Sequence, residues 1–180
     1  MKVATICLAA LSARVTSVGA FSALKVGSKI PAVEMFYDFD PEARCDMATY
    51  TANKKVAIPG YLESADALKD AGIEEVIVFC VNDPAVMGAW AKDQGTHGSI
   101  IKMFSDPTSE FTRACDMELT ADGPKSVGII NRSKRFAMIV ENNIITAMAV
   151  AEAESDPAGD DFPEKTLAPA LIKMAAAKKD

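Results

Sequence analysis

The sequence has few of the residues on which most catalytic and binding sites depend. Its 180 residues include one histidine, His97, and one tryptophan. A zinc site or a Ser-His-Asp triad is therefore not readily built. No pair of cysteines has the CxxC spacing, and the sequence contains no Gly-rich nucleotide-binding motif. We expect no metal and no cofactor, so any chemistry must come from cysteine.

The composition also excludes several classes of partner. Aromatic residues make up 7% of the chain, which gives no sign of a surface for base stacking or carbohydrate binding. A formal net charge of −6 argues against nucleic acid and anionic membranes as partners. A hydrophobic fraction of 49% with 24% charged residues indicates a folded globular protein, and the length fits one domain.

The first twenty residues have the pattern of a signal peptide. Lys2 is followed by the apolar run VATICLAAL and then by SARVTSVGA, with small residues at Val18 and Ala20. We expect residues 1–20 to be removed after entry into the secretory route; a buried first strand or helix is the alternative. The Ala20-Phe21 junction resembles the bipartite plastid presequences of algae with secondary plastids. We therefore expect delivery to a plastid and a folded domain over residues 27–180.

Three cysteines remain after such a cleavage, and they do not predict a disulfide framework because three thiols cannot pair completely. Cys45 lies between Arg44 and Asp46, whose charges oppose one another, and we expect an ordinary exposed thiol. Cys80 lies within the apolar run VIVFCV and is expected to be a small buried side chain. Cys115 follows a helix pattern, where it could be exposed. None is predicted to be a nucleophile.

Two segments repeat the same strand-to-helix pattern. The run VIVFCV leads through Asp83-Pro84 into a helix pattern, and the run IIKMFS leads through Asp106-Pro107 into another. In both, Asp is expected to cap the helix and Pro to occupy the first helical position. The repeated order of strand, Asp-Pro and helix predicts neighbouring strands of an α/β sheet.

The remaining segments complete the order of a thioredoxin-like fold. A loop-rich region comes first, in which IPAVEMFYDF is expected to be an edge strand or a hairpin arm. Lys55–Ile58 is predicted to be a short buried strand before a helix that ends at Ala71-Gly72. The runs RFAMIV and IITAMAV predict an antiparallel hairpin, and a last helix is expected from about Glu164. We therefore predict an α/β fold with a mixed central sheet flanked by helices.

From about Gly27 to its end the chain resembles the type II peroxiredoxins, which include the glutaredoxin-dependent enzymes of plants and algae. Three segments carry the resemblance: PGYLESADALKDAGIEEVIVFCVNDPAVMGAWAKDQ, IKMFSDPTSEFT and RSKRFAMIVENN. The resemblance implies reduction of hydroperoxides by a thiolate, glutaredoxin or thioredoxin as the reductant, a role in redox homeostasis and a homodimer. It also places the catalytic arginine of the family at Arg135.

One block of the family pattern is missing from this sequence. In the family, the central strand ends in a Pro-Gly turn, and a Thr-x-x-Cys segment follows at the first turn of a helix. Here KKVAI matches the start of that strand, and PGYLESADALK matches a later Pro-Gly within the helix. The block would stand between Ile58 and Pro59, so the central strand is expected to be truncated and the nucleophile absent. Taking Pro59-Gly60 as the active-site turn fails, because the next four residues include neither Thr nor Cys.

Two explanations of this gap stay open. Either the chain is a peroxiredoxin scaffold that has no peroxidase activity and pairs with active relatives, or the gene encodes an ordinary peroxidase and the gap is an artefact of gene prediction. A third hypothesis is a thioredoxin-fold binding module without redox chemistry. Its sign would be an exposed apolar patch or a ligand pocket.

Overall fold

The computed structural model describes residues 24–37, 43–52, 54–58, 64–153 and 162–177. Residues 1–20, which the sequence predicts to be a signal peptide, lie outside this part of the chain. The strands are β1 (Glu34–Tyr37), β2 (Arg44–Asp46), β3 (Lys55–Ile58), β4 (Glu75–Cys80), β5 (Ile101–Ser105), β6 (Phe136–Glu141) and β7 (Ile144–Val150). The helices are α1 (Met47–Tyr50), α2 (Ala65–Asp70), α3 (Pro84–Asp93), α4 (Glu110–Ala114), α5 (Asp122–Ser126), the 3₁₀ turn η1 (Pro163–Thr166) and α6 (Ala168–Ala176).

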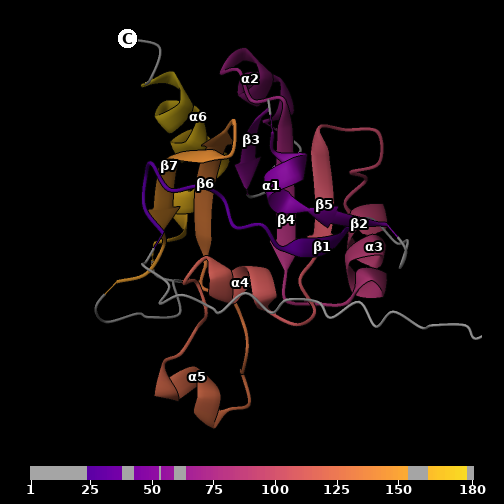
Figure 1. Cartoon of the computed structure of the whole chain (residues 1–180), viewed down its shortest axis with the longest axis vertical. Helices are drawn as coiled ribbons and strands as arrows, with labels where there is room; N and C mark the ends of the chain where they lie inside the picture. Colours follow the sequence, from indigo (N-terminus) through magenta and orange to yellow (C-terminus); the bar gives the residue numbers. More distant parts are fainter. Residues whose placement is uncertain (1–23, 38–42, 53, 59–63, 154–161, 178–180) are drawn as a thin grey trace, which may run out of the picture.

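The strands form one mixed sheet in the order β2-β1-β5-β4-β3-β6-β7 (Figure 1). The central strands β3, β4 and β5 are parallel, and β6 and β1 join them in antiparallel fashion on either side. The predicted α/β fold with a mixed sheet is therefore confirmed. The predicted hairpin arm is β1, although β2 and not β1 is the edge strand.

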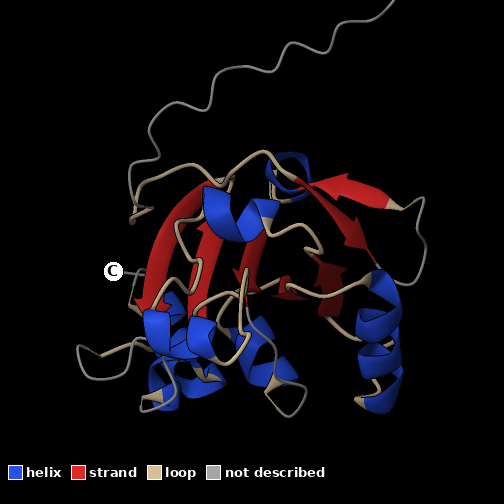
Figure 2. Cartoon of the chain, turned by 90° about the horizontal axis from the view of Figure 1, so that it is seen from below, coloured by secondary structure: helices blue, strands red, loops and turns tan. Residues whose placement is uncertain are grey.

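Helices lie on both faces of the sheet (Figure 2). One face packs into a core that includes the buried side chains of Met35, Ile77, Phe104 and Phe111. The other face is covered by α2, α3 and α6 and forms a second core; Leu68, Val76, Met87, Met103 and Leu171 belong to it. Helix α5 projects away from the sheet (Figure 1) and has no buried residue.

The first strand-to-helix connection has the predicted geometry. The Asp83 carboxylate accepts a hydrogen bond of 2.9 Å from the amide of Val86, and Pro84 is the first residue of α3. The hairpin between β6 and β7 also forms as predicted. Asn142 and Asn143 both adopt positive φ, at 48° and 65°, as a tight two-residue turn requires.

The second connection differs from the prediction. Pro107 is not the first helical residue, because α4 begins three residues later, at Glu110. Asp106 instead lies buried under the turn, and its carboxylate accepts hydrogen bonds from the amides of Phe111 and Thr112 at 3.2 and 2.8 Å. Asp106 thus still accepts hydrogen bonds from the first turn of α4, although the two donor amides lie five and six residues further along the chain. The last helix also starts later than Glu164, since η1 precedes α6.

No helix within the described residues is long and apolar enough to cross a membrane.

Candidate functional site

The site is a gap between the described parts of β4 and β6, beyond Ile58 at the end of β3. β3 pairs with β4 through Val56 opposite Glu75 and Ala57 opposite Val76. On its other side it pairs with β6, up to Ile58 opposite Met138. β4 continues to Cys80, and β6 begins two residues before Met138. Among the described residues, no strand lies between these two extensions. Residues 59–63, which follow β3, lie outside the described part of the chain, so the predicted truncation of this strand stays a prediction.

The sequence places a proline directly after Ile58, the last described residue of β3. In the register with β4, the amide after Ile58 would donate to the carbonyl of Ile77. Position 59 is proline, which has no N–H to donate. A proline is found at the ends or edges of sheets for this reason.

A cavity of about 1010 Å³ opens on this gap. It is lined by the end of β4, the start of β6, the side of β5, the exposed face of α3 and the start of α6. The lining is mainly apolar, and it includes Trp90, which is 40% exposed. Arg132, Lys134 and Arg135 supply positive charge along the side next to β6.

Arg135 lies directly before β6 and lines the cavity, at the place that the resemblance assigns to it. Its Nε donates a hydrogen bond of 2.9 Å to the hydroxyl of Thr166, which in turn donates to the carbonyl of Pro163 at 3.0 Å. Among the described residues, Thr166 is the hydrogen-bond partner of the Arg135 guanidinium. Because Nε is held, the two terminal nitrogens of the fork are fixed in orientation and can donate to an anion or a polar oxygen.

The neighbouring cations have partners of their own. Lys134 forms an ion pair with Glu152, with Nζ 2.8 Å from the carboxylate. Arg132 donates through Nη1 to the carbonyl of Val81, 2.8 Å away. Val81 directly follows β4, so Arg132 reaches across the gap from the β6 side to the β4 side.

Cys80 is the one thiol among the described residues that lines the cavity. It is half-buried, more open than the buried side chain expected from the sequence. Burial raises the pKa of its thiol, and the positive charge of Arg132 lowers it by less. The net shift is upward, so the environment does not favour the thiolate.

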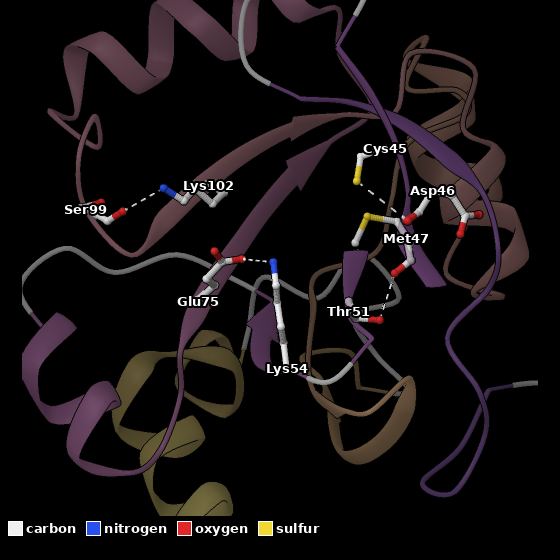
Figure 3. A network of polar contacts seen from close by, with 8 residues as sticks. All are labelled: Cys45, Asp46, Met47, Thr51, Lys54, Glu75, Ser99 and Lys102. Carbon is white, nitrogen blue, oxygen red and sulfur yellow. Dashed lines mark hydrogen bonds and ion pairs between the residues drawn. The ribbon is translucent and has the colours of Figure 1, made fainter. Parts of the chain in front are cut away.

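The other two described thiols lie away from the cavity. Cys45 is half-buried in β2, beside a polar network that includes the Lys54–Glu75 ion pair, with Nζ and Oε2 3.4 Å apart (Figure 3). Burial raises the pKa of Cys45, against the weaker effect of Lys54. Cys115, which could have been exposed, is completely buried, and burial raises its pKa strongly.

No group of three or more metal-ligating side chains comes together among the described residues. His97 is exposed at the surface. The sequence thus led to one residue of the cavity, Arg135. It did not reveal that Arg132 and Thr166 would join it, since these residues are separated by up to 34 positions in the chain.

The chain was compared with known proteins, and the family described as Redoxin matches residues 53–164, more than half of the sequence. Peroxiredoxin-2B of Arabidopsis thaliana is 38% identical over 98 residues, which are 54% of this chain and 56% of that protein. The chloroplastic peroxiredoxin-2E-2 of Oryza sativa subsp. japonica is 27% identical over 150 residues, 72% of this chain and 65% of that protein.

A solved structure, reduced Prx3 of Vibrio vulnificus in complex with hydrogen peroxide, superposes with a TM-score of 0.70 at 27% identity. The match covers 84% of this chain and 96% of that one. The chain therefore belongs to the redoxin family, as one of its peroxiredoxins, and its fold is thioredoxin-like. It spans little more than half the length of the first curated relatives that it matches.

Proposed function

We propose that the function of this peroxiredoxin is the thiol-dependent reduction of hydroperoxides in redox homeostasis, with the cavity around Arg135 as the peroxide site. We propose further that turnover requires a Thr-x-x-Cys block between Ile58 and Pro59, and that the chain as printed does not turn over peroxide. Residues 59–63, on one side of the missing block, lie outside the described part of the chain.

The observation that carries the proposal is the position of Arg135. Its guanidinium is fixed by Thr166 and faces a cavity at the end of the central strand. A fixed guanidinium can hold a peroxide oxygen and stabilise the negative charge that develops on the leaving oxygen. The relative from V. vulnificus has been solved with hydrogen peroxide, which supports a peroxide as the ligand here.

The described residues do not supply the other half of the reaction. A peroxidatic thiol attacks as the thiolate, and enzymes favour that form with a helix N-terminus or a nearby cation. The pKa values of Cys45, Cys80 and Cys115 are all raised, with burial as the largest cause. Cys80 is the best placed of them, but it ends a strand and is not at a helix N-terminus.

The test is turnover of hydrogen peroxide by the purified chain with glutaredoxin or thioredoxin as the reductant. We expect no turnover above a control without protein. The Arg135→Ala variant should behave identically, because there is no reaction for it to lose. Turnover that Arg135→Ala abolishes, while Arg113→Ala leaves it intact, would refute the requirement for the missing block.

The remaining parts of the proposal concern the cell. We propose that residues 1–20 are a signal peptide, that the redoxin domain extends over 27–180, and that the protein reaches a plastid. The chloroplastic relative from rice supports the last of these. We also propose glutaredoxin or thioredoxin as the reductant and a homodimer as the assembly, by analogy with the type II group.

A further inference from the structure

A long loop projects from the body of the molecule between α4 and β6. It comprises residues 119–132, includes α5, and is called the arm from here on (Figure 1). At its base the amide of Leu119 donates a hydrogen bond of 2.7 Å to the carbonyl of Arg132. Within it the amide of Ile129 donates to the carbonyl of Pro124 at 3.0 Å. These backbone bonds hold the arm in one conformation, so it presents a defined surface.

The outer part of the arm exposes three branched apolar side chains. Val127 is 74% exposed, Ile130 is 60% exposed and Ile129 is 43% exposed. The arm lies within the continuous described stretch 64–153. Single apolar residues are common on protein surfaces, but three of them within four consecutive positions form a group of the kind that marks an interaction site.

Cations lie on both sides of this apolar group. Lys125 comes two residues before Val127, and Arg132 comes two residues after Ile130. Both cations are exposed, and Lys125 forms no ion pair with a described carboxylate. The arm therefore carries the order cation, apolar group, cation, on a protein whose formal net charge is −6.

Helix α3 exposes the complementary pattern. One side of the helix and its N-cap carries four exposed residues at intervals of three or four positions: Asp83, Val86, Trp90 and Asp93. Val86 is 44% exposed and Trp90 is 40% exposed. Neither Asp forms an ion pair with a described cation. This side of the helix, the α3 face, therefore carries the order acid, apolar pair, acid.

The arm and the α3 face of one chain do not cover each other. The apolar side chains of both remain exposed, and the arm projects away from the sheet on which α3 packs (Figure 1). A second copy of the chain carries both patterns, so it can bring its arm to this α3 face and its α3 face to this arm. Such a reciprocal contact is what a two-fold dimer requires. The match of charge and of apolar side chains therefore favours a second copy as the occupant.

We propose that two copies of this chain form a two-fold dimer in which the arm of each lies on the α3 face of the other. The apolar side chains of the arm pack against Val86 and Trp90, and Lys125 forms an ion pair with Asp93 of the partner subunit. The proposal rests on the homodimer proposed as the assembly of this protein, and it assigns the surface that forms it. Because Trp90 also lines the cavity around Arg135, the arm of the partner subunit contributes to the wall of that cavity.

The direct test is the dissociation constant of the dimer, measured by analytical ultracentrifugation of the full chain. Ile130→Asp should weaken the dimer at least about tenfold, because it places a carboxylate against apolar side chains. Val26→Asp is the matched control and should change nothing, since Val26 is 55% exposed and lies outside both surfaces. A dimer that Ile130→Asp leaves intact would overturn this surface alone. A chain that stays monomeric at every concentration would overturn the homodimer as well, whereas peroxide turnover is measured separately.

A charge exchange tests the assigned ion pair. Lys125→Glu and Asp93→Lys should each weaken the dimer about tenfold, because a two-fold dimer contains the pair twice. The double variant should regain most of the affinity, since it restores the pair with the signs exchanged. Lys92→Glu is the control, because Lys92 is exposed on another side of α3. Losses that simply add in the double variant would contradict the pair.

The fluorescence of Trp90 tests the α3 side of the contact. Trp90 is the single tryptophan of the sequence, and it is 40% exposed in the single chain. As the protein concentration rises through the dissociation constant, its emission should shift to shorter wavelength and acrylamide should quench it less. Ile130→Asp should abolish both changes over the same concentrations. A dimer in which acrylamide quenches Trp90 as readily as in the monomer would show that the α3 face stays open, and would overturn the proposal.

Discussion

The three thiols that the structure describes should react slowly at neutral pH, and their surroundings fix the direction of the effect. Burial is the largest influence on Cys45, Cys80 and Cys115, and it raises all three pKa values above the ordinary cysteine value of about 8.5. A group with that ordinary value is about 3% thiolate at pH 7, so each of these thiols is ionised to a smaller extent. A thiol with a pKa well below 7 would be almost fully ionised, about thirtyfold more.

Iodoacetamide labelling followed by peptide mass spectrometry measures this directly. Between pH 7 and pH 8, the labelling rates of Cys45 and Cys80 should rise about tenfold, because the thiolate fraction of a weakly ionised thiol grows tenfold per pH unit. Cys115 should label only on unfolding, since its side chain is completely buried. Free cysteine under the same conditions is the control. A cysteine that labels faster than the control, with no dependence on pH between 6 and 8, would refute this reasoning and identify an activated nucleophile.

Three further predictions concern stability and use chemical denaturation. Asp106→Ala should lower the free energy of unfolding by about 3 kcal/mol or more, because a buried carboxylate that accepts three hydrogen bonds is lost. Asp83→Ala, at an exposed helix cap, should lower it by about 1 kcal/mol. Equal losses would contradict the assigned burial of Asp106. Met138→Ala should lower the free energy of unfolding by about 2–5 kcal/mol, because the Met138 side chain is buried in the core. The control Val127→Ala, at a site that is 74% exposed, should lower it by roughly 0.5 kcal/mol or less. A small loss at Met138 would place it outside the core. Ser105→Ala should be neutral or stabilising, since the buried Ser105 hydroxyl has no hydrogen-bond partner among the described residues. Marked destabilisation would contradict this.

Much of the fold was predictable because local signals and tertiary structure agree. The Asp83-Pro84 pair ends one strand and starts a helix as expected, and Asn142-Asn143 make the expected tight turn. Asp106-Pro107 carries the same two residue types and behaves differently. Its carboxylate is buried and reaches amides five and six residues away, an arrangement that depends on packing and is not visible in the pair itself.

The site was predictable only in part for the same reason. Arg135 could be assigned from the segment around it, because the family pattern is continuous there. The bond to Thr166 joins residues 31 positions apart, and nothing in either local sequence predicts it. The short length of β3, in contrast, is a prediction that the local sequence makes by itself. The junction of Ile58 and Pro59 predicts a short central strand from the sequence alone, and the register shows how far the neighbouring strands extend beyond it.

The most direct test of the central claim is a tryptic digest of the native protein, analysed by peptide mass spectrometry. The account requires that Ile58 be joined to Pro59, so that no Thr-x-x-Cys block is present between them. It predicts the cysteine-free peptide VAIPGYLESADALK, residues 56–69 of the sequence. If Lys55 is instead followed by a longer peptide that contains Thr-x-x-Cys, the account is contradicted, and the native protein has the nucleophile of a working peroxidase.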